Sequence, residues 1–281
     1  MEFQRNSWYA NRSRLMWENF RHRRLFVVSW NLERIYMEKC FQVLAGVLHL
    51  LYPKRCPLCD GVVYTPLWSR EYPICGECRA RAEYVKEPVC KICGKPLTDE
   101  RGELCQDCIR HPHGFVQGKA LWVYKGCVKE SVYRLKYGNR REYGIAYAQE
   151  LARRYGDWIK RNHIQAIIPI PLHKKRRRQR GYNQAEIIAG EIGRLLRLPV
   201  YDKLLARSIP TRPQKELNDR ERKNNLKKAF KVAGNKVQLD HILLVDDIYT
   251  TGSTMDGAAE ALREAGASHI YALSVSIGRG Y

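Results

Sequence analysis

Eight of the ten cysteines occur in four Cys-x-x-Cys pairs, a spacing that is typical of metal binding. One pair brings two thiolates to a zinc ion, and two pairs complete a tetrahedral site with no open position for a substrate. Pairing of neighbours predicts two structural zinc ions, one held by Cys56, Cys59, Cys75 and Cys78 and the other by Cys90, Cys93, Cys105 and Cys108. Disulfide pairing is the alternative, and the lack of a recognisable export signal argues against it.

Glycines and unpaired cysteines add two smaller expectations. Gly76 and Gly94 each directly follow a predicted ligand, so both are expected to supply the backbone freedom that tight metal-binding turns need. Cys40 and Cys127 stand alone and are predicted to be buried apolar residues.

Two adjacent carboxylates, Asp246 and Asp247, follow an apolar run over 242–245 and precede a hydroxyl-rich loop. The loop residues open a predicted helix, and they are Thr250, Thr251, Gly252, Ser253 and Thr254. Backbone N–H groups at a helix start, together with the helix dipole, favour a phosphate dianion, and glycine permits close approach. Carboxylates just ahead of such a loop can accept hydrogen bonds from a vicinal diol. A phosphate and a diol held together describe a ribose 5-phosphate.

Alternating strands and helices must position these residues. The hydrophobic pattern predicts strands at 120–124, 166–170, 241–245 and 270–277, and helices at 128–137, 143–158, 183–196 and 253–264. Such alternation predicts an α/β domain, a parallel sheet flanked by helices in three layers. We expect an extension of unknown value over 1–36 (Met37 is a second possible start), a double zinc ribbon over 37–112 and the α/β domain over 113–281. The apolar run at 41–52 is expected to form an amphipathic packing helix.

The charge is strongly positive and unevenly distributed. Fifty basic and 29 acidic residues give a net charge of +21, and residues 172–228 contribute 17 basic and 6 acidic residues, net +11. A focused positive field suits a polyanion or a phosphorylated ligand, whereas the alternative is a solvated face that maintains solubility. With 44% apolar residues, wholesale disorder is not expected. No apolar run reaches the ~18 residues of a membrane span, and the sequence favours a cytoplasmic location.

The stretch 242–254 resembles the signature with which type I phosphoribosyltransferases bind 5-phosphoribosyl 1-pyrophosphate (PRPP). With the cysteine pairs, Leu135-Lys136-Tyr137 and the segments 172–184 and 207–230, the chain from about 37 to 277 resembles the ComFC branch of the ComF family of competence proteins. The resemblance implies a type I phosphoribosyltransferase-like fold in which the loop and both aspartates bind PRPP with Mg²⁺. It implies that 169–173 faces pyrophosphate and that 207–225 forms a flexible hood. Candidate pyrophosphate or DNA contacts are Lys136, Arg180, Arg212, Arg220 and Arg222.

The function that the resemblance implies is uptake of single-stranded DNA in natural transformation. Its partners would be PRPP, single-stranded DNA and the DNA-import helicase, with peripheral membrane association. Tyr137, Tyr143 and Tyr182 lie among the basic residues and suit base stacking. Purine-salvage relatives carry an aspartate where this chain has Thr250, so hypoxanthine or guanine salvage is not expected. Two alternatives stay open: an active phosphoribosyltransferase with an unidentified acceptor, in which the catalytic residues are unknown, and a non-catalytic PRPP-sensing regulator.

Overall fold

The computed structural model describes residues 44, 46–48, 51, 53–65, 69–99, 101–207, 229–234 and 238–278. The predicted extension over 1–36, Cys40, most of the 41–52 helix and most of the expected hood, with Arg212, Arg220 and Arg222, lie outside the described residues. The chain divides into two units, residues 1–54 with 64–69 and residues 55–63 with 70–281. The second unit holds all eight paired cysteines and the sheet.

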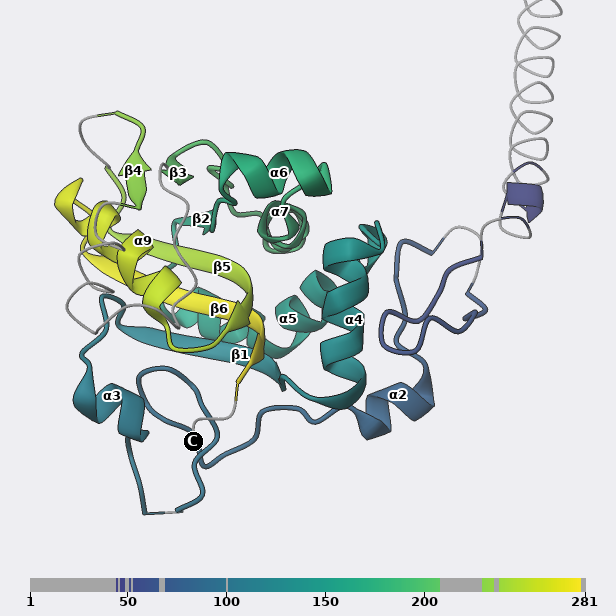
Figure 1. Ribbon diagram of the computed structural model, residues 1–281, viewed down its shortest axis with the longest axis horizontal. Coiled ribbons are helices and arrows are strands. Elements are labelled where there is room, and N and C mark those ends of the chain that lie inside the picture. Colours follow the sequence, from purple (N-terminus) through teal and green to yellow (C-terminus); the bar gives the residue numbers. More distant parts are fainter. Residues whose placement is uncertain are drawn as a thin grey trace, which may run out of the picture. The chain divides into compact units, whose positions relative to one another are not determined.

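Four parallel strands in the order β1-β6-β5-β2 form the central sheet of the second unit (Figure 1). They span Gln117–Val123 (β1), His269–Ile277 (β6), His241–Tyr249 (β5) and Ala166–Pro169 (β2). Neighbouring strands pair in parallel throughout. Continuous apolar runs suit such strands because both faces of a parallel sheet are covered. The predicted parallel α/β fold is confirmed.

Helices cover both faces of this sheet. Leu243 and Val245 pack in one core with residues of α4 (Gly126–Tyr137), α5 (Glu142–Arg161) and α7 (Gln184–Leu196). Ile242 and Leu244 pack in a second core with α9 (Ser253–Glu264). This alternation follows from the two-residue period of a strand, and it gives the three predicted layers.

Five short elements add to the predicted pattern. Helices α2 (Gly76–Arg81) and α3 (Gln106–Arg110) each begin directly after a paired cysteine. Helix α6 (Lys174–Arg180) has no buried residue. Its sequence contains no apolar residue, so the hydrophobic pattern does not predict it. Strands β3 (Leu205–Arg207) and β4 (Phe230–Val232) pair antiparallel and lie at either end of the segment predicted as a hood. In the described part of the chain, no helix is long and apolar enough to cross a membrane.

Strand β5 extends four residues beyond its predicted end at Val245. It continues to pair with β6 as far as Tyr249 opposite Ile277, whereas β2 ends at Pro169 opposite Val245. The two aspartates therefore lie within a strand that has lost its neighbour on one side. The sequence pattern placed the strand end too early because the acidic pair interrupts the apolar run.

Candidate functional site

The eight paired cysteines form two clusters whose thiols fit zinc. Within each cluster the four sulfur atoms all lie within 4.8 Å of one another, and the clusters are the two sets predicted from neighbouring pairs. The Sγ atoms of Cys59 and Cys75 are 3.8 Å apart, and those of Cys93 and Cys105 are 3.6 Å apart. Zn–S bonds of about 2.3 Å in a tetrahedron place sulfurs about 3.8 Å apart. These distances support two closed, structural zinc sites.

The first cluster is held by side chains of α4 and α5. Ser131 donates to the Pro57 carbonyl, and an Arg134 Nη donates to the Leu58 carbonyl at 2.6 Å. Asp60, directly after ligand Cys59, accepts a hydrogen bond from Tyr143 on α5. On the α2 side of the cluster, Arg79 and Glu150 form an ion pair with N···O 2.7 Å. The first three contacts hold the turn with Cys56 and Cys59 against α4 and α5, and the ion pair holds α2, which contains Cys78, against α5.

The second cluster is held largely by main chain against β1, with a side-chain hydrogen bond from Gln117 to the Lys91 carbonyl. The Gly118 N–H donates to the Ile92 carbonyl at 2.6 Å, and Gly94 has φ +75°. A Cβ atom at Gly94 would lie 2.7 Å from the Gly118 carbonyl oxygen, so only glycine fits there. The same expectation for Gly76 is wrong. Gly76 is the first residue of α2, and a Cβ there would have nothing within 4 Å.

The two aspartates have unequal surroundings. Asp247 shares the strand face of Leu243 and Val245 and is buried, and its carboxylate lies 3.0 Å from the Lys136 ammonium at the end of α4. Asp246 accepts a hydrogen bond from the Asp247 N–H at 2.8 Å. Burial and the neighbouring charge of Asp247 raise the pKa of Asp246 to about 7. Asp247 is thus charge-compensated, whereas Asp246 is the carboxylate available to a ligand.

The loop after β5 has the predicted form. Thr250 and Thr251 are exposed, Gly252 caps α9 in the left-handed region with φ +82°, and the helix begins at Ser253. The hydroxyls of Thr251 and Ser253 lie 2.7 Å apart. Thr254 follows in the first turn, half-buried. Hydroxyl and N–H donors therefore gather at the positive end of a 12-residue helix.

Further cations lie near the aspartates. Arg207 on β3 stacks on Phe230 with its guanidinium carbon 5.4 Å from the ring centre. Burial and the charge of Arg176 on α6 lower the pKa of Arg207, and Asp246 opposes that shift. Arg207 is therefore within electrostatic range of both Asp246 and Arg176. Sequence reasoning did not single out Arg207 or Arg176, because nothing in the local pattern distinguishes them from their basic neighbours.

The aromatic part of the basic region differs from the prediction. Tyr143 and Tyr182 are buried, and the Tyr182 hydroxyl donates to the Leu135 carbonyl, so neither ring is available to a base. Tyr137 is 60% exposed and packs on Tyr133, which is 64% exposed, with ring centres 4.8 Å apart. The predicted contact Arg180 lies over Tyr137, its guanidinium carbon 5.1 Å from the ring centre. The available stacking surface is therefore Tyr133–Tyr137–Arg180.

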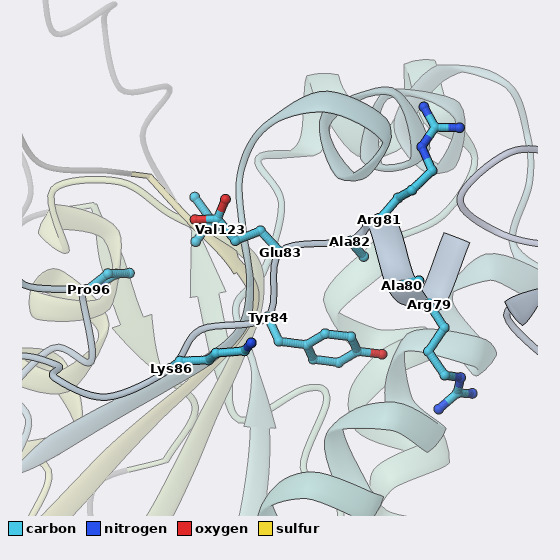
Figure 2. Close-up of a pocket in the computed structure, with 9 residues that line it drawn as sticks. All are labelled: Arg79, Ala80, Arg81, Ala82, Glu83, Tyr84, Lys86, Pro96 and Val123. Atoms are coloured by element: carbon cyan, nitrogen blue, oxygen red, sulfur yellow. The ribbon is translucent and has the colours of Figure 1, made fainter. Parts of the chain in front are cut away.

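A pocket of about 550 Å³ lies elsewhere, between α2, the segment after it and Pro96. Figure 2 shows the side chains that line it, which are Arg79, Ala80, Arg81, Ala82, Glu83, Tyr84, Lys86, Pro96 and Val123. None of the residues predicted to bind PRPP is among them. Three of the lining residues are cationic, but Arg79 is already paired with Glu150 and Arg81 with Glu77.

Two closed cysteine clusters attached to a parallel α/β sheet define a double-zinc-ribbon protein with an α/β domain. Residues 47–109 match the family model of the double zinc ribbon domain. Competence protein ComFC of Bacillus subtilis is 27% identical over 234 residues, which cover 79% of this chain and 92% of that protein. DNA utilization protein YhgH of Shigella flexneri is 30% identical over 224 residues, which cover 79% of this chain and 96% of that protein.

A third relative has a similar extent. Competence protein F of Haemophilus influenzae is 27% identical over 231 residues, which cover 80% of this chain and 91% of that protein. The chain therefore belongs to the ComF family, which these competence and DNA utilization proteins represent. The predicted family and the structural zinc are thereby confirmed.

Proposed function

We propose that this protein binds PRPP at the loop between β5 and α9 and supports the uptake of single-stranded DNA in natural transformation. Relatives named for competence and DNA utilization are matched over 91% to 96% of their own length, so the likeness is not confined to the zinc ribbons. We place a double zinc ribbon at 37–112, after an extension over 1–36, and a phosphoribosyltransferase-like domain at 113–281.

One observation carries the PRPP part of the proposal: two acids, a hydroxyl-rich loop and a helix start follow one another at the open edge of β5. In this arrangement the N–H groups of α9 and the hydroxyls of Thr251 and Ser253 would hold the 5-phosphate. Asp246 would accept hydrogen bonds from the ribose diol. Asp247 would keep Lys136 beside the ligand, where its ammonium meets the negative charges of the pyrophosphate.

Mg²⁺ fits the donor set in this proposal. It takes oxygen ligands, and Asp246 offers an oxygen donor that forms no ion pair with another described residue, whereas Asp247 is paired with Lys136. When bound with PRPP, the ion would supply charge compensation for the pyrophosphate. The residues of this chain orient the sugar and hold its phosphate.

Ligand binding is favoured over group transfer. Thr250 is exposed, and a threonine hydroxyl does not act as a base near neutral pH. Among the described residues of the loop, 250–254, none carries a side chain that could deprotonate an acceptor. We therefore keep an active phosphoribosyltransferase with an unidentified acceptor, and a PRPP-sensing regulator, as the alternatives.

The DNA part of the proposal uses the exposed face of α4 and α6. All residues of α6 except Arg180 are exposed, and six of its seven are basic. A groove of about 470 Å³ beside Tyr133 is lined by Tyr124, Gly126, Lys129, Glu130, Tyr133 and Arg134. Single-stranded DNA binds to surfaces that combine cations for the phosphates with aromatic rings for the bases. Tyr133, Tyr137 and α6 supply both.

The PRPP proposal is tested by titration calorimetry with PRPP and Mg²⁺. The double substitution Asp246→Asn with Asp247→Asn should abolish the binding heat, because it removes the diol acceptor and releases Lys136. Asp202→Asn, at an exposed aspartate outside the site, is the matched control and should bind like wild type. Unchanged affinity in the double variant would overturn the site.

The DNA proposal is tested by fluorescence anisotropy with a labelled oligo(dT) over a salt series. Tyr133→Ala with Tyr137→Ala should weaken binding by about tenfold or more at every salt concentration, as loss of stacking requires. Lys175→Gln with Arg178→Gln should instead reduce the salt slope by about two. Tyr201→Ala, at an exposed tyrosine outside this surface, should change neither quantity. A flat salt response in wild type would leave the basic region only a solubility role.

The two parts are joined by a transformation assay. The chain would be expressed in a transformable host that lacks its own family member, as wild type or as the double-aspartate variant. Loss of transformation in the variant, with unchanged protein level, would link PRPP binding to DNA uptake. Normal transformation would separate the two activities. Contact with the DNA-import helicase and a cytoplasmic, membrane-peripheral location stay predictions.

A further inference from the structure

Three polar side chains, of which His113 and Tyr249 are buried and Asp256 is half-buried, form a hydrogen-bonded row next to the loop after β5. The imidazole Nδ1 of His113 is 2.9 Å from a carboxylate oxygen of Asp256 on α9, and its Nε2 is 3.4 Å from the hydroxyl of Tyr249, the last residue of β5. A carboxylate only accepts, so Nδ1–H donates to Asp256. The His113 side chain is 2% exposed and Tyr249 is buried. The Gly114 N–H also donates to Asp256, at 2.9 Å.

Gly252 packs against the side chains of His113 and Tyr249. A Cβ atom at Gly252 would lie 2.4 Å from the Tyr249 hydroxyl and 2.8 Å from the His113 ring. The αL turn at Gly252, which precedes α9, is thus in close contact with both rings. Any shift of His113 or Tyr249 has to move the turn, because packed interiors transmit small displacements.

Asp256 gives the contact an electrostatic role. It lies in the first turn of α9, where its negative charge competes with a phosphate for the positive helix end. His113 and Gly114 hold its carboxylate by hydrogen bonds from outside the helix. The negative charge of Asp256 is thereby partly compensated by these N–H donors.

The same histidine is joined to the second zinc cluster. Helix α3 contains ligand Cys108 and ends at Arg110, and His113 lies between α3 and β1. Phe115, two residues after His113, stacks on it with ring centres 4.8 Å apart. The connection from the metal cluster to β1 therefore passes through the residue that supports the loop.

We propose that His113 and Asp256 are positioning residues that hold the loop over 250–254 in its ligand-binding form and tie it to the second zinc ribbon. Buried His113 acts through Gly252 and Asp256, not on a ligand. The inference rests on the proposed PRPP site for its functional meaning, but the loop conformation is measured without PRPP.

The test compares substitutions at His113 in the full, zinc-loaded chain. His113→Ala removes both hydrogen bonds, whereas His113→Asn keeps an amide N–H near the Nδ1 position and should restore the contact with Asp256. His269→Gln, at an exposed histidine of the same sheet, is the matched control. Hydrogen–deuterium exchange of 250–254 is followed without ligand, and PRPP–Mg²⁺ affinity is measured separately.

We expect His113→Ala to speed exchange in the loop by about tenfold or more and to weaken PRPP binding by a similar factor, while zinc content stays at two. His113→Asn should recover most of both losses, and His269→Gln should match wild type. Should His113→Ala fail to fold, Asp256→Ala replaces it, because it removes the acceptor of both the His113 and the Gly114 hydrogen bonds and should likewise speed exchange in the loop.

The outcomes separate this inference from the proposed function. Loop exchange unchanged in folded His113→Ala, or no recovery in His113→Asn, would overturn the positioning role. Faster loop exchange in His113→Ala together with a wild type that fails to bind PRPP would support the positioning role and overturn the proposed ligand.

Discussion

The two zinc clusters have the same ligands but are attached to the α/β domain in different ways. The first is held by side chains that reach from α4 and α5 to carbonyl oxygens of its turn, as Arg134 does to Leu58. The second is held largely by main chain, with Gly94 so close to Gly118 that a Cβ atom at Gly94 would not fit. A side-chain contact is lost when that one side chain is replaced, whereas the main-chain contact depends on the glycine that permits the close approach.

Burial of the ligands follows the same division at one position. The second ligand differs, since Cys59 of the first cluster is exposed and Cys93 of the second is buried. The other ligands match, because each cluster has two further buried cysteines and one half-buried cysteine. Both clusters reach the α/β core: Cys56 and Cys78 pack in the core that holds Leu243 and Val245 of β5, and the buried ligands of the second cluster pack in the core that holds α9. The first cluster supports α4, which brings Lys136 to Asp247, and the second supports the loop through His113.

Removal of one ligand from each cluster should give the largest contrast. Cys90→Ser removes a buried ligand of the second cluster, and we expect one zinc per chain and loss of cooperative unfolding, because a hydroxyl and unliganded thiols are then left buried, whereas Cys59 is exposed. Cys59→Ser should also leave one zinc per chain but keep a cooperative transition. Zinc content by mass spectrometry and thermal unfolding by circular dichroism measure both.

Equal unfolding of the two cysteine variants would contradict the division between the clusters. Cys127→Ser is the control, since Cys127 is half-buried and belongs to neither cluster. It should keep two zinc ions.

Gly94 and Gly76, each directly after a zinc ligand, test the comparison with a smaller expected effect on stability. Gly94→Ala should lower the free energy of unfolding by about 2–3 kcal/mol, because alanine at φ +75° is strained and its Cβ would meet the Gly118 carbonyl. Gly76→Ala, at the start of α2, should be neutral or stabilising by up to about 0.5 kcal/mol. Urea denaturation of both variants measures the difference. Equal effects would show that the second cluster is not held by this close approach.

Local pattern predicted most of the fold, and also the start of α9. Apolar runs located β2 and β5, and Gly252 with Ser253 marked the helix start that the structure has. Long-range contacts were beyond it. His113 and Asp256 are 143 positions apart, and no local feature of either residue indicates the other.

Local sequence also did not predict which tyrosine rings are exposed. Tyr137 and Tyr182 look alike in sequence, because each has an arginine or lysine within two positions. Only the packing of α4 decides that one ring is exposed and the other buried. Gly76 and Gly94, which each follow a ligand, were equally ambiguous, since φ depends on how the turn is packed and not on its sequence position.

The aspartate pair extends the comparison to the two faces of β5. Asp246 has its pKa raised from 3.8 to about 7, so the folded protein binds a proton that the unfolded chain releases. The resulting stability is complete below pH 3.8 and is lost as the pH rises through 7. Asp246→Asn should therefore stabilise the protein at pH 8 by about 1–3 kcal/mol and by less at pH 5.

Denaturant unfolding at the two pH values measures this effect, with Asp202→Asn as the exposed control that should show no pH-dependent gain. Equal stability of Asp246→Asn and wild type at pH 8 would mean that the charged carboxylate of Asp246 does not destabilise the folded protein. A gain in stability together with loss of PRPP binding is the pattern expected of a carboxylate kept for a ligand.

The smallest effect tests whether single side chains hold the first cluster. Arg134→Met keeps the aliphatic stem and removes the hydrogen bond to the Leu58 carbonyl, which should cost about 1 kcal/mol. That hydrogen bond holds the turn with Cys56 and Cys59. A chelator should therefore remove the zinc ion of the first cluster several-fold faster, and the zinc ion of the second cluster at the wild-type rate. Arg194→Met, which removes an exposed pair with Glu191 on α7, should leave both rates unchanged. If Arg134→Met accelerated both equivalents alike, the two clusters would be coupled through the α/β core and the contrast between side-chain and main-chain attachment would not hold.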